Sequence, residues 1–560
     1  GVRIYTRPMR IMLVNWARVW DGAGVGGGVN GYAQALALEL VDLGHEVHWV
    51  SSGLMYADDK GLHVRRHPDW LGVRAYEIVN SPVLAPSIVQ FKDPTSETRA
   101  PALEDLFGQI LDWIRPEVVH FHNIEGLSAG CVGSAARHPS RPAVLFSLHN
   151  YHTICPQVYL LQGHRHPCHD ARGGVACKTC IPSPDPTATR SERAAEWAAA
   201  PKHAPTIKAV GAELTTLLKP GVPAPPMPGT EIRTLDDVAA DMRAADPDNR
   251  GRTARILAER APARTAGAPL PILNDATRDP SLDTPSNEYG VRRRAMVEAL
   301  NECDRVLAVS EFVRRKFESM GVEGTRLVTQ HIGTTLNRIV SRRSNLAFVP
   351  PPHDPARPRP IRMTFMGVNH WYKGLPFFLE TLDTLEPEVL GMFHLSIFAQ
   401  GAEQTEWMVR RLEPRLAGVR MHGGYDQADI PWILGGQDIG LVPSVWWDNA
   451  PQTVFEFFAC GVPVLASNVG GIPDFVRHGE NGMLFRANDR DDLAACLKRL
   501  AAEPGMLNAL RRGVRPPKDI AEHARELLGV YAECRHARAG SANGPVLRPQ
   551  PPSVSSGDPR

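Results

Sequence analysis

The feature that most constrains the fold is a pair of strand–helix series separated by a proline-rich segment. In both series, short apolar runs typical of buried parallel strands alternate with amphipathic helices. The first series has expected strands at 11–15, 46–51, 118–121, 143–148, 305–309 and 326–330, and helices at 29–43 and 311–320. The second has expected strands at 361–366, 393–399, 439–442 and 462–466, and helices at 375–385, 403–416 and 491–500. Two such series predict an α/β protein with two doubly wound, Rossmann-like domains.

Composition divides the chain further. Residues 346–360 are dense in proline, which predicts a linker. Residues from about 181 to 285 are rich in Ala, Pro, Arg and Asp and lack strand periodicity, so we expect a largely disordered insertion with helices at 234–245 and 253–260. The expected units are an N-terminal domain at 9–345, the linker, a C-terminal domain at 361–515, a segment at 516–536 with a helix at 520–535, and a disordered tail at 537–560.

Overall charge and cysteine usage exclude several classes of protein. The net charge of +1 implies no strong affinity for nucleic acid. No apolar run reaches membrane-spanning length and no signal-peptide pattern precedes the first strand. Nine cysteines, an odd number, favour a reducing cytoplasm over a disulfide framework.

The basic runs 292–294 and 314–316 could touch anionic lipid headgroups at the inner face of a membrane, although solvated helix faces are the commoner explanation.

Two acids mark the second domain. Asp448 and Glu456 stand eight positions apart, on the loop and helix that follow the strand expected at 439–442. Carboxylates accept hydrogen bonds from sugar hydroxyls, and amides at a helix start hold phosphate, here those of residues 452–454. This combination suits a sugar joined to a phosphate. The alternative is a buried strand–helix–strand unit whose acids only cap and pair, but Trp446 and Trp447 on a loop serve no core.

The stretch from 442 to 466 resembles the spaced-acid motif of the GT-B retaining glycosyltransferases of family 4. In that motif Glu, seven residues and Glu precede an Ala-Cys-Gly-x-Pro-Val run. This chain keeps the run at 459–464 and the second acid as Glu456, whereas the first acid is Asp448, one methylene shorter. The resemblance implies a GT-B fold with two domains facing a cleft and a final helix that crosses back to the first domain.

The resemblance also implies a reaction. A hexose-type sugar would pass from a nucleotide diphosphate sugar to an acceptor, with retention of configuration and no metal required for catalysis. Glu456 would bind the donor ribose, Asp448 would face the transferred sugar, and the amides of Gln452, Thr453 and Val454 would take phosphate. The acceptor, whether a polysaccharide, a glycolipid or another glycan precursor, is not indicated by the sequence.

The segment 365–374 ends one strand and starts a helix. Family members carry Gly-Arg and then Lys-Gly here, with both cations on the donor diphosphate. Lys373 matches the lysine, but Val368 stands at the arginine position. A diphosphate leaving group needs its growing charge neutralised, so the missing arginine and the short Asp448 motivate a second hypothesis, a non-catalytic nucleotide-sugar-binding scaffold subunit. A GT-B epimerase or sugar-releasing hydrolase is a third.

A glycine-rich loop follows the first strand. Gly22, Gly24 and Gly27 formally match a dinucleotide fingerprint, but the second strand ends without the acid that would hold a ribose. The resemblance favours a donor-phosphate and acceptor loop, in which the amides of Gly27 and Gly28 approach the ligand as only residues without Cβ allow. A flexible surface loop is the alternative.

Two histidine clusters follow strands, at 120–122 and 149–152. Strand carboxyl ends are where open α/β sheets bind ligands. The second cluster resembles the Leu-His-Asp segment of the family, with Asn150 in place of the acid, which implies that His149 lies near the reacting sugar. His122 is a second candidate, and for both a structural histidine is the alternative.

Four cysteines fall within 26 residues: Cys155, Cys168, Cys177 and Cys180. The Cys177-x-x-Cys180 pair is a good tetrahedral chelate, and four thiolates suit a structural zinc. His164, His166 and His169 are alternative ligands, and an iron–sulfur cluster or free thiols remain open. A catalytic zinc is not expected, because four cysteines leave no open position. The Asp-x-Asp at 489–491 directly precedes a helix, which predicts a helix cap in place of a metal site.

Overall fold

Two sheets build two α/β domains. The computed structural model describes residues 7–57, 61–86, 94–163, 166–169, 171–180, 190–191, 285–342, 349–354 and 356–540. The N-terminal sheet has the strand order β10-β9-β6-β5-β1-β2-β4-β3, and only β3 runs antiparallel to its neighbour. Its strands are β1 (Arg10–Val14), β2 (Glu46–Met55), β3 (His63–Arg66), β4 (Arg74–Val79), β5 (Val118–Phe121), β6 (Ala143–Leu148), β9 (Arg305–Ala308) and β10 (Leu327–Thr329).

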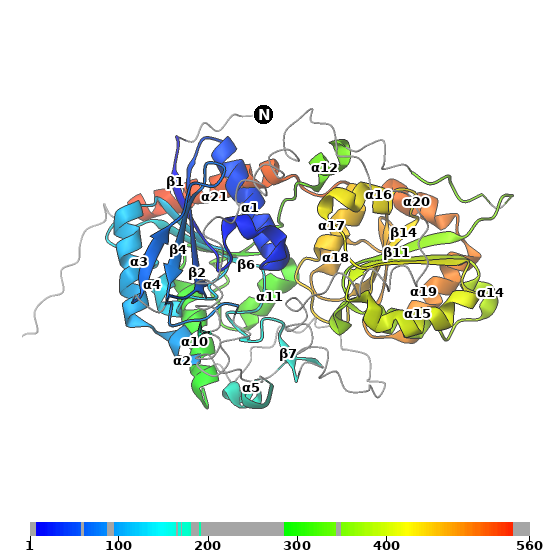
Figure 1. Cartoon of the computed structure of the whole chain (residues 1–560), viewed down its shortest axis with the longest axis horizontal. Helices are drawn as coiled ribbons and strands as arrows, with labels where there is room; N and C mark the ends of the chain where they lie inside the picture. The colour runs from blue at the N-terminus through cyan, green and yellow to red at the C-terminus, as the bar shows by residue number, and fades with distance from the viewer. Residues whose placement is uncertain are drawn as a thin grey trace, which may run out of the picture.

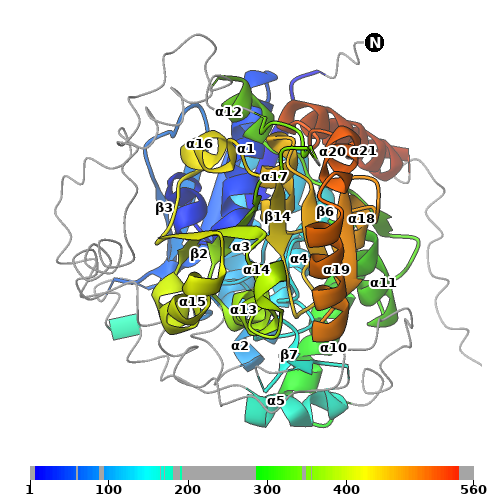
Figure 2. The ribbon, with the colours of Figure 1, turned by 90° about the vertical axis from the view of Figure 1, so that its right-hand side faces the viewer.

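The C-terminal sheet is parallel throughout, in the order β13-β12-β11-β14-β15-β16. Its strands are β11 (Ile361–Val368), β12 (Phe393–Gln400), β13 (Gly418–His422), β14 (Ile439–Val442), β15 (Val464–Asn468) and β16 (Gly482–Arg486). Helices α13 (Leu375–Leu382), α14 (Pro387–Leu390), α15 (Glu406–Leu412) and α19 (Arg490–Ala502) lie on one face, and α16 (Ile430–Leu434) and α17 (Gln452–Ala459) on the other (Figures 1 and 2). This arrangement confirms the predicted doubly wound α/β class.

The chain order reverses at one point in each sheet. In the first sheet, β1 lies between β2 and β5, and in the second, β11 lies between β12 and β14. Open α/β sheets bind ligands outside the strand carboxyl ends at such switch points. The fold therefore directs attention to the residues that follow β1, β5, β11 and β14.

Helices cover both faces of the N-terminal sheet. On one face α3 (Pro101–Ile114), α4 (Ala129–Ala136) and α10 (Glu288–Glu302) pack together, α3 through five buried apolar residues at helical spacing. On the other, α1 (Gly27–Asp42) packs against α21 (Ile520–Gly540), the last helix, which follows the C-terminal domain in the chain but lies along the N-terminal one (Figure 1). Shorter helices are η1 (Val19–Gly24), α2 (Pro94–Thr98), α5 (Val175–Cys180), α11 (Glu311–Ser319), α12 (Leu336–Arg342), α18 (Ile472–Phe475) and α20 (Met506–Gly513).

Several expected elements differ from the observed ones. The helix expected at 403–416 is three short pieces, because Pro414 follows α15 and a separate turn at Ala402–Thr405 precedes it. α21 continues to Gly540, so the tail expected from residue 537 begins later. The insertion residues 181–189 and 192–284, with their two expected helices, and the tail 541–560 lie outside the described residues. Asp489 caps α19 as expected, accepting from the amide of Asp492 at 3.0 Å.

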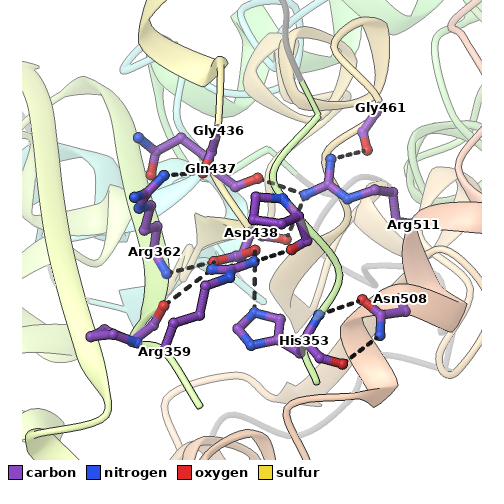
Figure 3. A network of polar contacts seen from close by, with 11 residues as sticks. His353, Arg359, Arg362, Gly436, Gln437, Asp438, Gly461, Asn508 and Arg511 are labelled. Carbon is purple, nitrogen blue, oxygen red and sulfur yellow. Dashed lines mark hydrogen bonds and ion pairs between the residues drawn. The ribbon is translucent and has the colours of Figure 1, made fainter. Parts of the chain in front are cut away.

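The proline-rich segment before β11 is fixed to the C-terminal domain by a buried carboxylate (Figure 3). The Arg359 guanidinium donates two hydrogen bonds of 2.7 Å to Asp438, and the amide of Arg362 donates to the same carboxylate at 2.9 Å. His353 Nε2 lies 3.3 Å from Asp438 Oδ1. Asp438 precedes β14, so this contact lies at the end of the sheet opposite the switch point.

Arg511 on α20 closes the same network from the other side. It donates to the carbonyls of Gly461 at 3.0 Å and Gln437 at 2.6 Å, while Asn508 forms two hydrogen bonds with the backbone of His353. The Arg359 hydrogen bonds and charge lower the pKa of Asp438 to about 2 against the opposing effect of burial. The segment therefore packs as part of the domain surface.

We predict that Asp438→Asn destabilises the C-terminal domain by about 3 kcal/mol at neutral pH, because it leaves Arg359 without its buried partner. A carboxylate with a lowered folded-state pKa stabilises the fold above its unfolded pKa, near 4, and loses that contribution as the pH falls towards 2. Urea unfolding at several pH values measures the difference. The difference in free energy of unfolding between the unchanged protein and Asp438→Asn should become smaller between pH 5 and pH 2. A difference that stays constant over this range would contradict the ion-pair explanation.

Candidate active site

The strand carboxyl ends of the two sheets meet at a seam between the domains. Asn449, on the loop after β14, donates through Nδ2 to the carbonyl of His149 at 2.8 Å. The Tyr151 hydroxyl donates to the carbonyl of Trp447 at 2.9 Å. The structure thus brings the predicted histidine of the first domain to the predicted acid loop of the second.

Helix starts also meet at this seam. A Cβ built on Gly28, in the first turn of α1, would lie 3.1 Å from Cγ of Gln452, the first residue of α17. Gly27 has open space where a side chain would be and a φ of +61°. The glycine pair and the α17 start, both predicted to approach donor phosphate, are therefore neighbours.

Asp448 and Lys373 form an ion pair. Lys373 Nζ donates to Asp448 Oδ2 at 2.7 Å and lies 5.5 Å from the ring centre of Trp446. Ser444 Oγ donates to the same carboxylate oxygen at 3.3 Å. The Asp448 side chain is 7% exposed and the Lys373 side chain 33%, so the lysine is the partner that a ligand can reach. Val368, at the position of the missing arginine, is 40% exposed and places no charge at the end of β11.

Glycines fix the path of the acid loop. Gly374 has a φ of +84°, and a Cβ there would lie 1.7 Å from the carbonyl oxygen of Pro443. Gly470 has a φ of +59°, and its Cβ would lie 2.2 Å from the carbonyl oxygen of Asp448. The next amide, of Gly471, donates to that carbonyl at 2.7 Å. Only residues without a side chain permit both approaches, so the glycines hold Asp448 in place.

Glu456 is buried on α17 and paired with a tyrosine. The Tyr425 hydroxyl donates to Glu456 Oε2 at 2.6 Å. Burial raises the pKa of Glu456 to about 7, and the hydrogen bond from Tyr425 opposes this shift. The carboxyl is thus poised between its charged and neutral forms near neutral pH. Tyr425 was not predicted from the sequence, because it lies 31 positions from Glu456 with no motif between them.

The start of α17 has no side-chain cap, since its N-cap residue is Pro451. The amide of Val454 donates to the carbonyl of Pro451 at 3.1 Å, so this amide already has an internal acceptor. Thr453 lies near Gly367, whose Cβ would be 3.8 Å from Thr453 Cγ2. Of the three residues predicted to take phosphate, Gln452 and Thr453 therefore fit the role better than Val454.

His149 lies within a cluster of histidines and tyrosines. Its Nε2 is 3.2 Å from Nδ1 of His122, and its ring centre is 4.9 Å from that of Tyr32. The Tyr32 hydroxyl lies 2.6 Å from Nε2 of His523 on α21. Burial lowers the pKa of His149 to about 3, so the imidazole is neutral at physiological pH. Tyr32 and His523 were not predicted, because 491 residues separate them and no local pattern links them.

The four clustered cysteines line one cavity of about 10 Å³, together with Arg293. The backbone amide of Gly163 donates to Cys180 Sγ at 3.2 Å, and the Cys180 thiol donates to the carbonyl of Leu161 at 3.2 Å. Within the part of the chain that the structure describes, no three His, Cys, Asp or Glu side chains are arranged to hold a metal ion. None of the nine cysteines, all of which lie in the described ranges, forms a disulfide bond. The structure thus groups the thiols, and the structural zinc stays a prediction.

Of the three alternative ligands, the structure describes the side chain of His169 only. His169 packs edge-on against Trp447, with ring centres 4.9 Å apart, and His164 is outside the described residues. Tyr159 similarly packs against Trp446 at 5.5 Å. Residues near Cys155 and Cys168 in the sequence therefore contact Trp446 and Trp447. Both tryptophans are buried in the hydrophobic core, so the expectation that they serve no core is wrong.

Two residues of the first basic run, Arg292 and Arg293, are buried, so they are not placed to touch lipid headgroups. Arg292 is 0% exposed and pairs with Glu97, and Arg293 is 3% exposed and donates to the carbonyl of Ile154 at 2.8 Å. In the second run, Arg314 and Arg315 pair with Glu311 on their own helix. None of the helices in the described ranges combines the length and apolarity needed to cross a membrane.

Comparison with known proteins agrees with this geometry. Residues 360–503 match the family described as glycosyl transferases group 1. The C-terminal domain is a group 1 glycosyltransferase domain. It contains Lys373, Asp448 and Glu456, the three charged residues predicted for the donor site.

Two curated relatives share part of this chain. This chain is 40% identical to a D-inositol 3-phosphate glycosyltransferase of Nocardiopsis dassonvillei over 134 residues, which is 23% of this chain and 29% of the relative. It is 24% identical to a glycogen synthase of Mycobacterium tuberculosis over 192 residues, which is 34% of this chain and 46% of the relative. The chain therefore matches less than half the length of these relatives.

Two solved structures share the whole fold. A sucrose-phosphate synthase of Thermosynechococcus elongatus aligns with a TM-score of 0.53 and 14% identity, covering 95% of this chain and 100% of the other. An α,α-trehalose 6-phosphate synthase of Burkholderia multivorans aligns with a TM-score of 0.52 and 10% identity, covering 96% and 99%. The predicted GT-B fold is confirmed.

We predict that Glu456 makes the folded protein less stable as the pH rises from about 4.5 to 7. Between about pH 4.5 and 7 the folded carboxyl keeps a proton that the unfolded chain has lost, so this group's contribution to stability falls as the pH rises through that window. Glu456→Gln removes the effect. Its melting temperature should fall less between pH 5 and pH 8 than that of the unchanged protein, and parallel curves would show that Glu456 is ionised normally.

Proposed function

We propose that this protein is a retaining glycosyltransferase that moves a hexose-type sugar from a nucleotide diphosphate sugar to a polysaccharide, glycolipid or other glycan precursor. The observation that carries the proposal is that Lys373 pairs with Asp448 in the second domain, while Asn449, the next residue, contacts His149 of the first domain. Glu456 lies on α17, the helix that follows this loop. The group 1 match of the C-terminal domain supports it. The names of the two relatives, a glycosyltransferase and a glycogen synthase, support the same reaction class.

Lys373 is the proposed partner of the donor diphosphate. Its ion pair with Asp448 keeps the ammonium at a fixed position without a ligand, so little reorganisation is needed when negative charge develops on the leaving group. The amides of Gln452 and Thr453 add the positive end of the α17 dipole. Together these groups would neutralise the donor diphosphate, a role that family members share with an arginine at the position of Val368. Gly27 and Gly28, opposite the α17 start, leave room for the phosphates.

The two acids receive different roles. Asp448 lies beside Lys373 and one residue from Asn449, which contacts His149, so it is placed to accept from hydroxyls of the transferred sugar. Glu456 is eight residues away on α17, beside Tyr425, and is the proposed acceptor for the donor ribose hydroxyls. Since an ionised carboxylate accepts more strongly than a neutral carboxyl, donor affinity should increase as Glu456 loses its proton.

His149 is proposed to bind the transferred sugar by a hydrogen bond. Its neutral imidazole offers one donor and one acceptor, and its low pKa, about 3, makes it a poor proton acceptor at neutral pH. A positioning hydrogen bond is therefore a better assignment than general base catalysis.

We expect Lys373→Ala, Asp448→Ala and Glu456→Ala each to lower the rate of sugar transfer by roughly 100-fold or more, because each removes a charged group proposed to bind the donor. A thermal-shift screen of nucleoside diphosphate hexoses first identifies the donor. Release of nucleoside diphosphate in the presence of candidate acceptors then measures the rate. Lys498→Ala, which breaks an exposed 2.8 Å ion pair with Glu386 on another part of the same domain, is the matched control and should retain full activity.

A nucleotide-sugar-binding scaffold is the second candidate, favoured by the apolar Val368 and by the engagement of Lys373 with Asp448. It would bind nucleotide tightly and release no diphosphate from any donor. Release without an acceptor would instead indicate a hydrolase. Full transfer activity in both Asp448→Ala and Glu456→Ala would rule out the site assignment itself.

A further inference from the structure

The C-terminal helix α21 reaches His149 along two routes of buried polar side chains. The first runs from His523 through the hydroxyl of Tyr32, at 2.6 Å, to the Tyr32 ring, whose centre is 4.9 Å from that of His149. The second runs from Tyr531, whose hydroxyl is 2.7 Å from His120 Nδ1. The His120 ring lies 4.1 Å from that of His122, which contacts His149.

Burial keeps the histidines of this cluster neutral. It lowers the pKa of His120 and His122 well below the ordinary value, and that of His523 to about 3. A neutral imidazole carries one proton, so in a contact between two ring nitrogens one must donate and the other accept. The hydrogen bond between His122 Nδ1 and His149 Nε2, 3.2 Å long, therefore has a direction.

The surroundings of His122 set that direction. Its Nε2 is buried and has no hydrogen-bond partner among the described residues. Buried N–H groups without an acceptor are rarer than acceptors without a donor, so the His122 proton belongs on Nδ1. That N–H donates to Nε2 of His149, which leaves the His149 proton on Nδ1. The carbonyl of His149 is meanwhile held by Asn449, one residue beyond Asp448.

We infer that the hydrogen bond from His122 fixes His149 as the Nδ1–H tautomer and that α21 is a positioning element for this pair. Tyr531 holds His120 against the His122 ring, and His523 holds Tyr32 against the His149 ring. His149 then presents a hydrogen-bond donor to an oxygen of the bound sugar. This inference rests on the proposed function for the identity of the ligand but not for the tautomer. Tyr32, Tyr531 and His523 touch no substrate in this account and act through His149.

The tautomer can be measured without an activity assay. In protein labelled with ¹⁵N-histidine, His149 is assigned by the signal lost in His149→Gln. The inference predicts a protonated Nδ1 and an unprotonated Nε2 over the neutral pH range. A protonated Nε2, or a titration of His149 near pH 6.5, would overturn it whatever the activity of the protein.

The role of α21 is tested by conservative changes. Tyr531→Phe and Tyr32→Phe each remove one hydroxyl and keep the ring, and we expect each to shift the His149 nitrogen signals and to lower kcat by roughly 10- to 100-fold, with the KM for donor little changed. Tyr56→Phe is the matched control, since it removes a buried 2.9 Å hydrogen bond to the carbonyl of Ser81 elsewhere in the same domain. Unchanged His149 signals in both variants would contradict the positioning role. If the unchanged protein shows no sugar transfer, the proposed function is refuted, but the measured tautomer of His149 is not affected.

Discussion

The site depends on the hydrogen bonds that join the acid loop of the second domain to the first domain. Asn449 donates to the carbonyl of His149, and Tyr151 donates to the carbonyl of Trp447, so the residues on both sides of Asp448 are held from across the seam. Glycines hold the loop from its own side, where Gly374 and Gly470 allow backbone approaches that a side chain would block. Contacts from both domains therefore hold the backbone of Asp448 in place, and this position allows its side chain to pair with Lys373.

Local sequence predicted much of the core of this arrangement. Buried parallel strands such as β5, β6 and β14 are short continuous apolar runs, and their observed bounds equal the expected ones. Lys373, Asp448 and Glu456 were predicted as site residues because they follow such strands at motif spacing, and parallel sheets bind ligands at the ends of their strands. The edge strand β10 was expected, but the edge strands β3, β13 and β16 were missed. β13 is half-exposed and contains Gly418 and Arg420, so it lacks the apolar run that marks a central strand.

Contacts between distant segments could not be predicted. Tyr425 approaches Glu456, and His523 approaches Tyr32, because of how helices pack across the fold, and no spacing in one segment encodes such a pairing. The basic run at 292–294 could not be predicted correctly for the same reason. A run of arginines suggests solvent-exposed side chains, but Arg292 is buried because it pairs with Glu97, an acid far away in the sequence. The cysteines lie close in sequence and around one cavity, but their spacing does not decide whether they bind metal.

We propose that one ligand site is shared between the start of α1 and the loop and helix that carry Asp448 and Glu456. Hydrogen–deuterium exchange of the whole protein, with and without the nucleoside diphosphate hexose that gives the largest thermal shift, tests it most directly. We expect slower exchange on ligand addition at two separate segments, 26–34 and 446–456. Slower exchange in the second segment alone, with none at the start of α1, would contradict it.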